Sequence, residues 1–177
     1  MKDIELLLKK ILGNKNYQFI RKIFLFIYVK TIKNIPKELE GNFILKNDKY
    51  SIRMLKDNKF SSIKKLYSNE LMKRDKLYIL PLSKNRFLES TNFYFGIFKD
   101  QRMIAYFTLN VRGYRNFEYG ISVSKHYRRI GIAKTVVSLV ETFLNKHNYD
   151  FYVRIHLKNK KSPSFFKKRG FSLIKKI

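Results

Sequence analysis

The stretch that decides the fold of this chain is Val123-Ser-Lys-His-Tyr-Arg128-Arg129-Ile130-Gly131-Ile132-Ala133-Lys134. It predicts the end of a strand, a short loop and the start of a helix, because residues 117–123 are strand-like and residues 133–144 carry apolar side chains at helical spacing. A helix start presents backbone N–H groups without partners and the positive end of the helix dipole. Gly131 and Ala133 keep bulky side chains away from that backbone, so a pyrophosphate could approach it closely.

Positive charge surrounds the same loop, since Arg128, Arg129 and Lys134 lie within it. Arg-x-x-Gly-x-Ala is a short pattern, and an ordinary basic turn between a strand and a helix is the alternative interpretation. The loop alone therefore predicts an anion site without identifying the anion.

Composition limits the classes of protein that the chain can belong to. A length of 177 residues with 45% apolar residues suits one domain with an appendage and excludes a disordered protein. No cysteine is present and the three histidines are dispersed, so we expect no metal site. Thirty-nine Lys and Arg against 13 Asp and Glu give a net charge of +26. That field would attract nucleic acid, anionic lipid or a polyanionic ligand, although a solvated basic surface is an equally simple interpretation.

The first 42 residues predict a helical extension. One helix is expected up to Gly13, and a second from Tyr17 to Lys33, apolar over much of its circumference. Together they predict a helical hairpin that its own domain, a membrane surface or a protein partner would cover. No signal peptide is recognisable, and the longest apolar run, residues 23–29, is too short to span a bilayer. We therefore expect a cytoplasmic protein without a transmembrane segment.

The rest of the chain predicts a mixed α/β fold, antiparallel first and crossover-connected later. A hairpin is expected over residues 43–53, followed by a helix after Asp57. The further expected elements are strands at 93–98, 103–111 and 117–123, a helix from 129, a strand over 151–157, a helix from 163 and a strand from 171.

A second patterned stretch runs from Asn159 to Phe171. Within it, Ser162 suits a helix N-cap, Pro163 the first helical position and Gly170 the helix end. A short helix that returns to a strand explains this stretch without any ligand.

Taken together, the two stretches resemble the GNAT superfamily of acyl-CoA-dependent acetyltransferases. The shared pattern is a strand, Val-x4-Arg-x-x-Gly-x-Ala, a helix, a strand and then Asn-x6-aromatic-x3-Gly-Phe. The resemblance covers about residues 49–171 and implies a central mixed β-sheet flanked by helices. With it, the domain organisation is expected to be a helical extension at 1–42 and an acetyltransferase domain at 43–177.

The resemblance also implies a cofactor, acetyl-CoA, and the residues that bind it. The strand backbone at its splayed end would pair with the pantetheine arm, and the loop amides would hold the pyrophosphate. Asn159 would reach the pantetheine from the far side, and Phe166 would lie near the thioester sulfur. The expected cofactor-binding residues are Ile121, Ser122, Val123, Arg128, Arg129, Gly131, Ile132, Ala133, Lys134, Asn159 and Phe166.

The chemistry of acetyl transfer predicts one catalytic candidate, Glu118, as the base for the acceptor amine, because it is the one acid on residues 117–123. Strand alternation places Glu118 on the face opposite Val123 unless a bulge intervenes. Phe166 departs from the family, which often has a tyrosine there, and a phenyl ring cannot donate a proton to the leaving thiolate.

The function expected from these residues is transfer of an acetyl group from acetyl-CoA to a primary amine. The positive charge favours a phosphate-bearing acceptor, such as an amino-sugar nucleotide or an aminoacyl-tRNA, or else an acidic protein. The alternative is a non-catalytic module of the same fold that binds CoA or nucleic acid. Because the chain stops soon after Phe171, an open sheet edge would also invite pairing into a homodimer.

Overall fold

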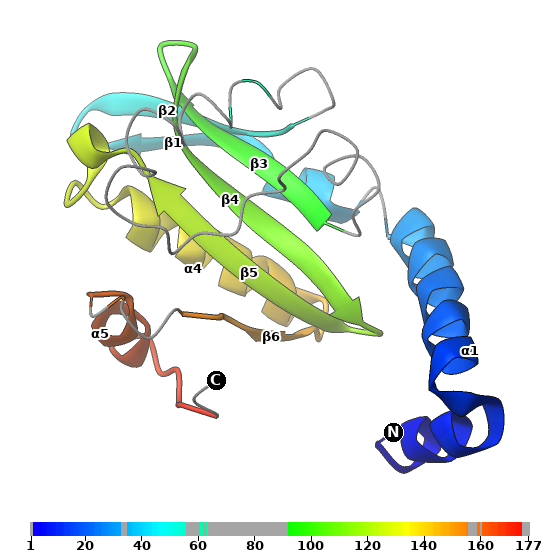
Figure 1. Cartoon of the computed structure of the whole chain (residues 1–177). Coiled ribbons are helices and arrows are strands. Elements are labelled where there is room, and N and C mark those ends of the chain that lie inside the picture. Colours follow the sequence, from blue (N-terminus) through cyan, green and yellow to red (C-terminus); the bar gives the residue numbers. More distant parts are fainter. Residues whose placement is uncertain are drawn as a thin grey trace.

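The computed structural model describes residues 2–32, 35–55, 61, 63, 92–155, 159 and 161–174. These residues form a six-stranded sheet whose strands follow one another in chain order (Figure 1). The strands are β1 (Gly41–Leu45), β2 (Asp48–Met54), β3 (Asn92–Lys99), β4 (Arg102–Gly113), β5 (Asn116–Val123) and β6 (Asp150–Tyr152). The helices are α1 (Lys2–Thr31), η1 (Ile35–Leu39), η3 (Lys125–Tyr127), α4 (Ile132–Lys146) and α5 (Lys161–Lys167). The predicted α/β class with a mixed central sheet is confirmed.

The first five strands are antiparallel, and tight turns join two of the pairs. Lys46 and Asn47 join β1 to β2, and Asp100 and Gln101 join β3 to β4. All four residues have positive φ, the conformation that two-residue hairpin loops require. The sheet changes direction only at β6, which pairs with β5 in parallel after the crossover through α4.

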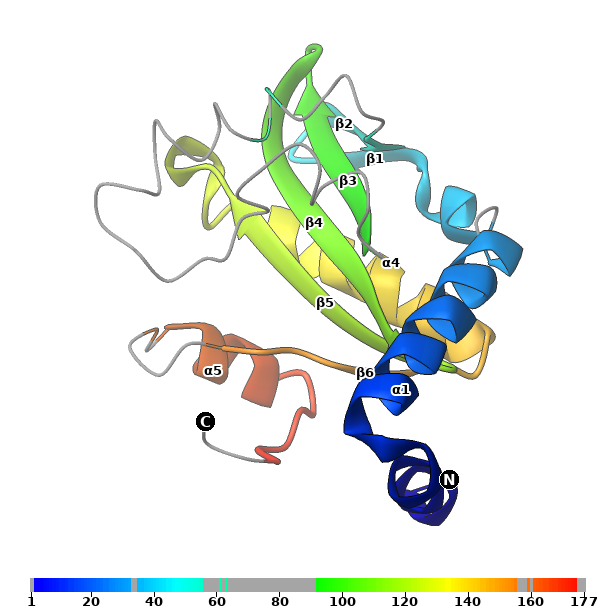
Figure 2. The ribbon, with the colours of Figure 1, turned by 45° about the vertical axis from the view of Figure 1, so that its right-hand side comes forward.

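The hydrophobic core lies between the sheet and α4, which covers one face of it (Figure 2). Phe95 and Phe107 stack on neighbouring strands with ring centroids 4.4 Å apart. Val136 and Leu144 of α4 are fully buried against the same cluster. This packing fixes the start of α4 beneath the end of β5, where the predicted loop lies.

The N-terminal extension differs from the predicted hairpin. The two helical segments join at Gly13, whose φ of 71° and ψ of 154° break the helix as the sequence predicted. The first segment turns away at this kink and does not fold back along the second (Figures 1 and 2). The short stretch between Gly13 and Tyr17 stays helical, so it provides no loop for a hairpin. Among the described helices, none has the length and apolar character needed to cross a bilayer.

The C-terminal part also differs from prediction in its details. Helix α5 begins at Lys161, before Pro163, and the described residues 171–174 after it form no strand. Strand β6 is three residues long and is the edge of the described sheet. Of the predicted helix after Asp57, only residues 61 and 63 are described, and both are helical. Residues 156 and 157, the end of the predicted strand 151–157, lie outside the described residues.

Candidate active site

The start of α4 has backbone donors without helical acceptors. Gly131 caps the helix in the left-handed conformation with φ of 100°, and no side chain bonds the cap. The first bond of the helix runs from the Thr135 N–H to the Gly131 carbonyl oxygen at 3.0 Å. Within the described chain, no backbone acceptor therefore meets the N–H groups of Ile132, Ala133 and Lys134. Three such donors at the positive end of a 15-residue helix favour an anion.

Basic side chains surround this helix start, and no acidic residue lies in the first turn. Arg129 and Lys134 are exposed and add formal charge to the helix dipole. Arg128 is also exposed, but its Nε donates to the Val123 carbonyl oxygen at 2.9 Å. Arg128 therefore ties the loop to the end of β5 in addition to contributing charge.

A groove of about 410 Å³ adjoins the same helix start. Its volume is in the range of small-molecule sites, and its wall is one side of α4. The residues that line it are Leu45, Gly131, Lys134, Thr135, Ser138, Leu139 and Thr142. The backbone donors at the start of α4 thus adjoin a groove of a size suited to part of a ligand.

Strand β5 separates from β6 before it reaches the loop. The two strands pair at Asn116, Phe117 and Glu118 and at no later described residue, whereas β5 pairs with β4 as far as Val123. The predicted splay is therefore present, and Ile121, Ser122 and Val123 lie on the part of β5 without a β6 partner. An unpaired strand edge can bond an extended chain that carries amide groups.

The two predicted residues beyond β6 make contacts within the chain. The Asn159 Oδ1 accepts from the Ser162 N–H at 3.2 Å, and its Nδ2 donates to the Ser162 Oγ at 2.9 Å. Asn159, rather than the predicted Ser162, therefore caps the start of α5. Phe166 is buried and meets the rings of Tyr119 and Phe171 edge-on, so α5 packs on β5 beside the splay.

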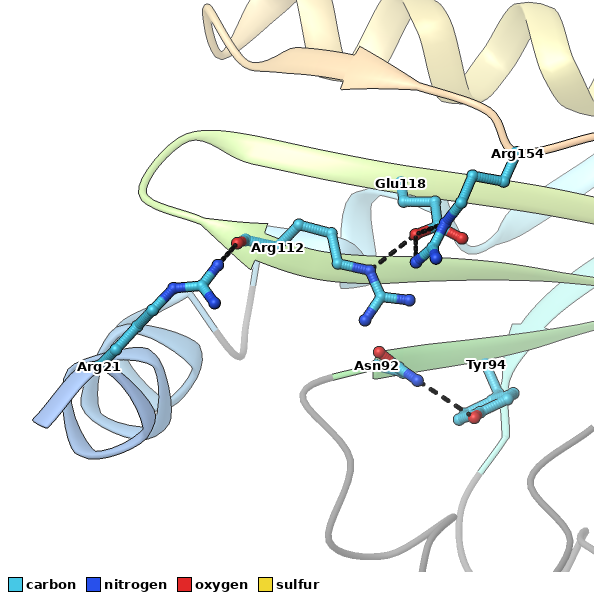
Figure 3. Close-up of polar contacts among 6 residues, drawn as sticks. All are labelled: Arg21, Asn92, Tyr94, Arg112, Glu118 and Arg154. Carbon is cyan, nitrogen blue, oxygen red and sulfur yellow. Dashed lines mark hydrogen bonds and ion pairs between the residues drawn. The ribbon is translucent and has the colours of Figure 1, made fainter. Parts of the chain in front are cut away.

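Glu118 lies between two arginines on the sheet face opposite α4 (Figure 3). Its Oε2 accepts from the Arg112 Nε at 2.7 Å and from the Arg154 Nη2 at 2.5 Å. Burial raises the pKa of Glu118, but the hydrogen bonds from Arg154 and Arg112 outweigh it and hold that pKa below its ordinary value of 4.5. The β5 register has no bulge between Glu118 and Val123, so the two side chains lie on opposite faces.

Further polar groups on this face were missed by sequence reasoning. Asn110 pairs with Glu118 across the strands, and its buried Oδ1 has no partner within the described chain. On β3, the Asn92 Nδ2 donates to the Tyr94 hydroxyl at 3.4 Å (Figure 3). Alternation along residues 103–111 could have placed Asn110 on this face, but no local pattern links Arg154 to Glu118. Residues 58–91, which include the helix predicted after Asp57, lie outside the description except for residues 61 and 63.

The fold is shared with solved structures of a GNAT domain and of acetyltransferases. The GNAT domain of S. lividans PAT superposes with a TM-score of 0.64 at 13% identity, covering 77% of this chain and 90% of that one. The ribosomal-protein-S18-alanine N-acetyltransferase from Escherichia coli gives 0.58 at 14% identity, covering 71% and 79%. An aminoglycoside acetyltransferase, meta-AAC0020, from an uncultured soil metagenomic sample gives 0.53 at 14% identity, covering 72% and 91%. These identities are low, so the likeness is one of fold.

The sequence itself identifies the family. The model of the acetyltransferase (GNAT) family matches residues 60–171, which is more than half of the chain. No curated protein matches the chain in sequence. The chain therefore belongs to the acetyltransferase (GNAT) family, as the two sequence motifs predicted.

Proposed function

We propose that the chain is an N-acetyltransferase that transfers an acetyl group from acetyl-CoA to a primary amine. The observation that carries the proposal is the start of α4, where three amide N–H groups lie beside the unpaired edge of β5. This pair of features suits a molecule with a pyrophosphate followed by an extended chain of amides, and acetyl-CoA has both. When bound, acetyl-CoA supplies the thioester carbonyl that the acceptor amine attacks.

The chain's own groups would divide the binding work between them. The N–H groups of residues 132–134, with the Arg129 and Lys134 side chains, would hold the pyrophosphate. The backbone of residues 121–123 would bond the pantetheine amides, while Asn159 and Phe166 would form the far side of the same channel. Alignment of amine and thioester supplies much of the acceleration in such a site, since it removes the entropy cost of their encounter.

The acceptor would bear a negative group, because cationic side chains surround the face where it would bind. Arg154 is exposed and Arg112 is partly exposed, and both flank the single carboxylate of Glu118. An amino-sugar nucleotide, an aminoacyl-tRNA and an acidic protein surface each fit this charge. Glu118 is proposed as the base that removes the amine proton. Its ion pairs with Arg112 and Arg154 favour a second role, in which the carboxylate holds these two arginines in place.

The test is to incubate the chain with acetyl-CoA and a panel of amines, peptides, tRNA and sugar nucleotides while free thiol is followed. We expect thiol release with at least one anionic acceptor and a raised KM in the variant Arg154→Gln. Arg102→Gln, which removes an exposed cation from the β3–β4 turn, is the control and should change little. Absence of CoA binding would contradict the cofactor assignment.

A non-catalytic module is the second candidate function. It is favoured by the lowered pKa of Glu118 and by the buried phenyl ring of Phe166, since neither group is suited to transfer a proton at neutral pH. Such a module would bind CoA or nucleic acid without turnover. Measurable CoA affinity with no thiol release across the whole panel would establish it in place of the enzyme.

We also propose the domain organisation and assembly that the sequence suggested. Residues 1–42 would form an extension and residues 43–177 the acetyltransferase domain. The short edge strand β6 would be the place where a second chain pairs into a homodimer. Light scattering over a concentration series tests the homodimer, and a monomeric mass throughout would contradict it.

A further inference from the structure

The second segment of α1 exposes an apolar stripe that nothing in the described chain covers. Each of the five large side chains in it has between 45% and 64% of its surface exposed. They are Phe19, Ile20, Ile23, Phe24 and Ile27. At about 100° per residue they occupy an arc of about 140° on one side of the helix. Single exposed apolar residues are ordinary, but a continuous stripe marks an interaction surface.

A different side of the helix already has its partners, since Arg21 and Tyr28 lie about 110–130° around the helix axis from the centre of the stripe. The Arg21 Nη2 donates to the Arg112 carbonyl oxygen at 2.8 Å (Figure 3), and the Tyr28 hydroxyl accepts from the Arg115 N–H at 3.2 Å. The ring of Tyr28 also contacts that of Tyr114, with centroids 5.3 Å apart. The sheet therefore fixes which side of the helix faces inward and leaves the apolar stripe facing outward.

Charge decides what kind of partner the stripe fits. From residue 14 to residue 31 the sequence contains no Asp or Glu and four basic residues, Lys15, Arg21, Lys22 and Lys30. Lys15 and Lys22 lie within about 20° of each other around the helix axis, at one border of the stripe. A second copy of the chain would bring the same positive charges against these, on a molecule whose net charge is +26. An anionic surface, by contrast, attracts the lysines while the apolar side chains enter it.

We propose that the stripe of α1 binds the surface of an anionic lipid bilayer, with the helix lying in the plane of the interface. The apolar side chains enter the boundary between headgroups and acyl chains, and the lysines at the border contact lipid phosphates. The contacts between the sheet and α1 involve a different side of the helix, so they leave the stripe free to meet the bilayer. This surface is separate from the proposed acetyl-transfer site and would exist whether or not the chain is an enzyme.

The test is co-sedimentation of the full chain with phosphatidylcholine vesicles, with and without phosphatidylglycerol, at low and high salt. We expect at least about tenfold more bound protein on the anionic vesicles at low salt, and loss of most of it at high salt. The double variant Phe24→Gln with Ile27→Gln should lose this binding. Ile174→Gln, which removes another exposed apolar side chain, should retain it.

A second pair of variants separates lipid electrostatics from the general charge of the chain. Lys15→Gln with Lys22→Gln should reduce binding several-fold, whereas Lys46→Gln with Lys49→Gln, equal in charge but on the β1–β2 hairpin, should not. Circular dichroism establishes that each variant is folded before it is compared. No binding to anionic vesicles at low salt, or equal binding by the stripe variant, would overturn the proposal. The first of these outcomes would leave a protein partner as the occupant of the stripe.

Discussion

Gly131 is the residue whose backbone conformation the anion site depends on most directly. Its φ of 100° is one that L side chains rarely adopt, although a Cβ there would meet Leu45 only at an ordinary 3.8 Å. We expect Gly131→Ala to lower the free energy of unfolding by about 1–2 kcal/mol through backbone strain alone. Gly41→Ala is the matched control, since Gly41 has open space around it and no positive φ. Equal stabilities of the two variants in urea titrations would contradict this reasoning.

The ion pairs of Glu118 predict that the stability of the fold depends on pH in the acid range. Because its folded pKa lies below 4.5, its ion pairs stabilise the fold above that pH, and the stabilisation disappears as pH falls through the folded pKa. We expect Glu118→Gln to lower the free energy of unfolding at pH 7 by about 1–2 kcal/mol. The difference from wild type should disappear in acid, and Asp150→Asn, at an exposed carboxylate, should show no comparable change. A difference that persists at low pH would contradict the ion-pair explanation.

The same substitution separates the two roles proposed for Glu118 in turnover. A base that removes the amine proton would contribute about 10²–10⁴-fold to kcat, so Glu118→Gln would lower kcat by that factor. If Glu118 instead positions Arg112 and Arg154, the variant should raise KM for an anionic acceptor and leave kcat nearly unchanged. Steady-state kinetics at saturating acetyl-CoA distinguish the two, with Arg154→Gln as the comparison because it removes one of the positioned groups.

Among the helices and strands, α5 has a cap, Asn159, whose contribution to stability can be measured. Asn159 accepts a hydrogen bond from the Ser162 N–H, so Asn159→Ala should lower the free energy of unfolding by about 1 kcal/mol. Asn159→Asp keeps the acceptor oxygen and should recover most of that loss. If both variants are as stable as wild type in urea titrations, the cap contributes nothing and Asn159 is free for another role.

The elements also show what sequence patterns can predict and what they cannot. The hairpins and the β5–α4 turn follow from local signals, which are alternation, turn residues and helical spacing, whereas the splay of β5 was expected only from the family resemblance. The N-terminal kink does not, because Gly13 marks a break in the helix without fixing the direction of the next segment. The partners of Glu118 do not either, since Arg154 reaches it from beyond β6, 36 residues along the chain. The loop between β5 and α4 could thus be predicted from the sequence. The side-chain contacts on the sheet face opposite α4 could not, because they depend on tertiary structure.

At the scale of the whole molecule, the charge of +26 predicts a strong salt dependence of CoA binding. Salt screens the attraction between the CoA phosphates and the positive charges of the protein. The affinity for CoA should therefore fall steeply as salt rises through the physiological range. Calorimetric titrations at several salt concentrations measure the slope. Pantetheine, which has no phosphate, is the control ligand and should show a much smaller slope. Equal slopes for the two ligands would mean that the phosphates bind away from the basic surface.

An NMR titration of the chain with CoA, followed in ¹H–¹⁵N spectra, tests the proposed cofactor site directly. The start of α4 is proposed as the pyrophosphate site, so the amides of Ile132, Ala133 and Lys134 should show the largest shifts. Those of residues 121–123 should shift with them, while the amides of α1 should not. CoA binding that leaves residues 132–134 unshifted, or no binding at all, would contradict the assignment of this site.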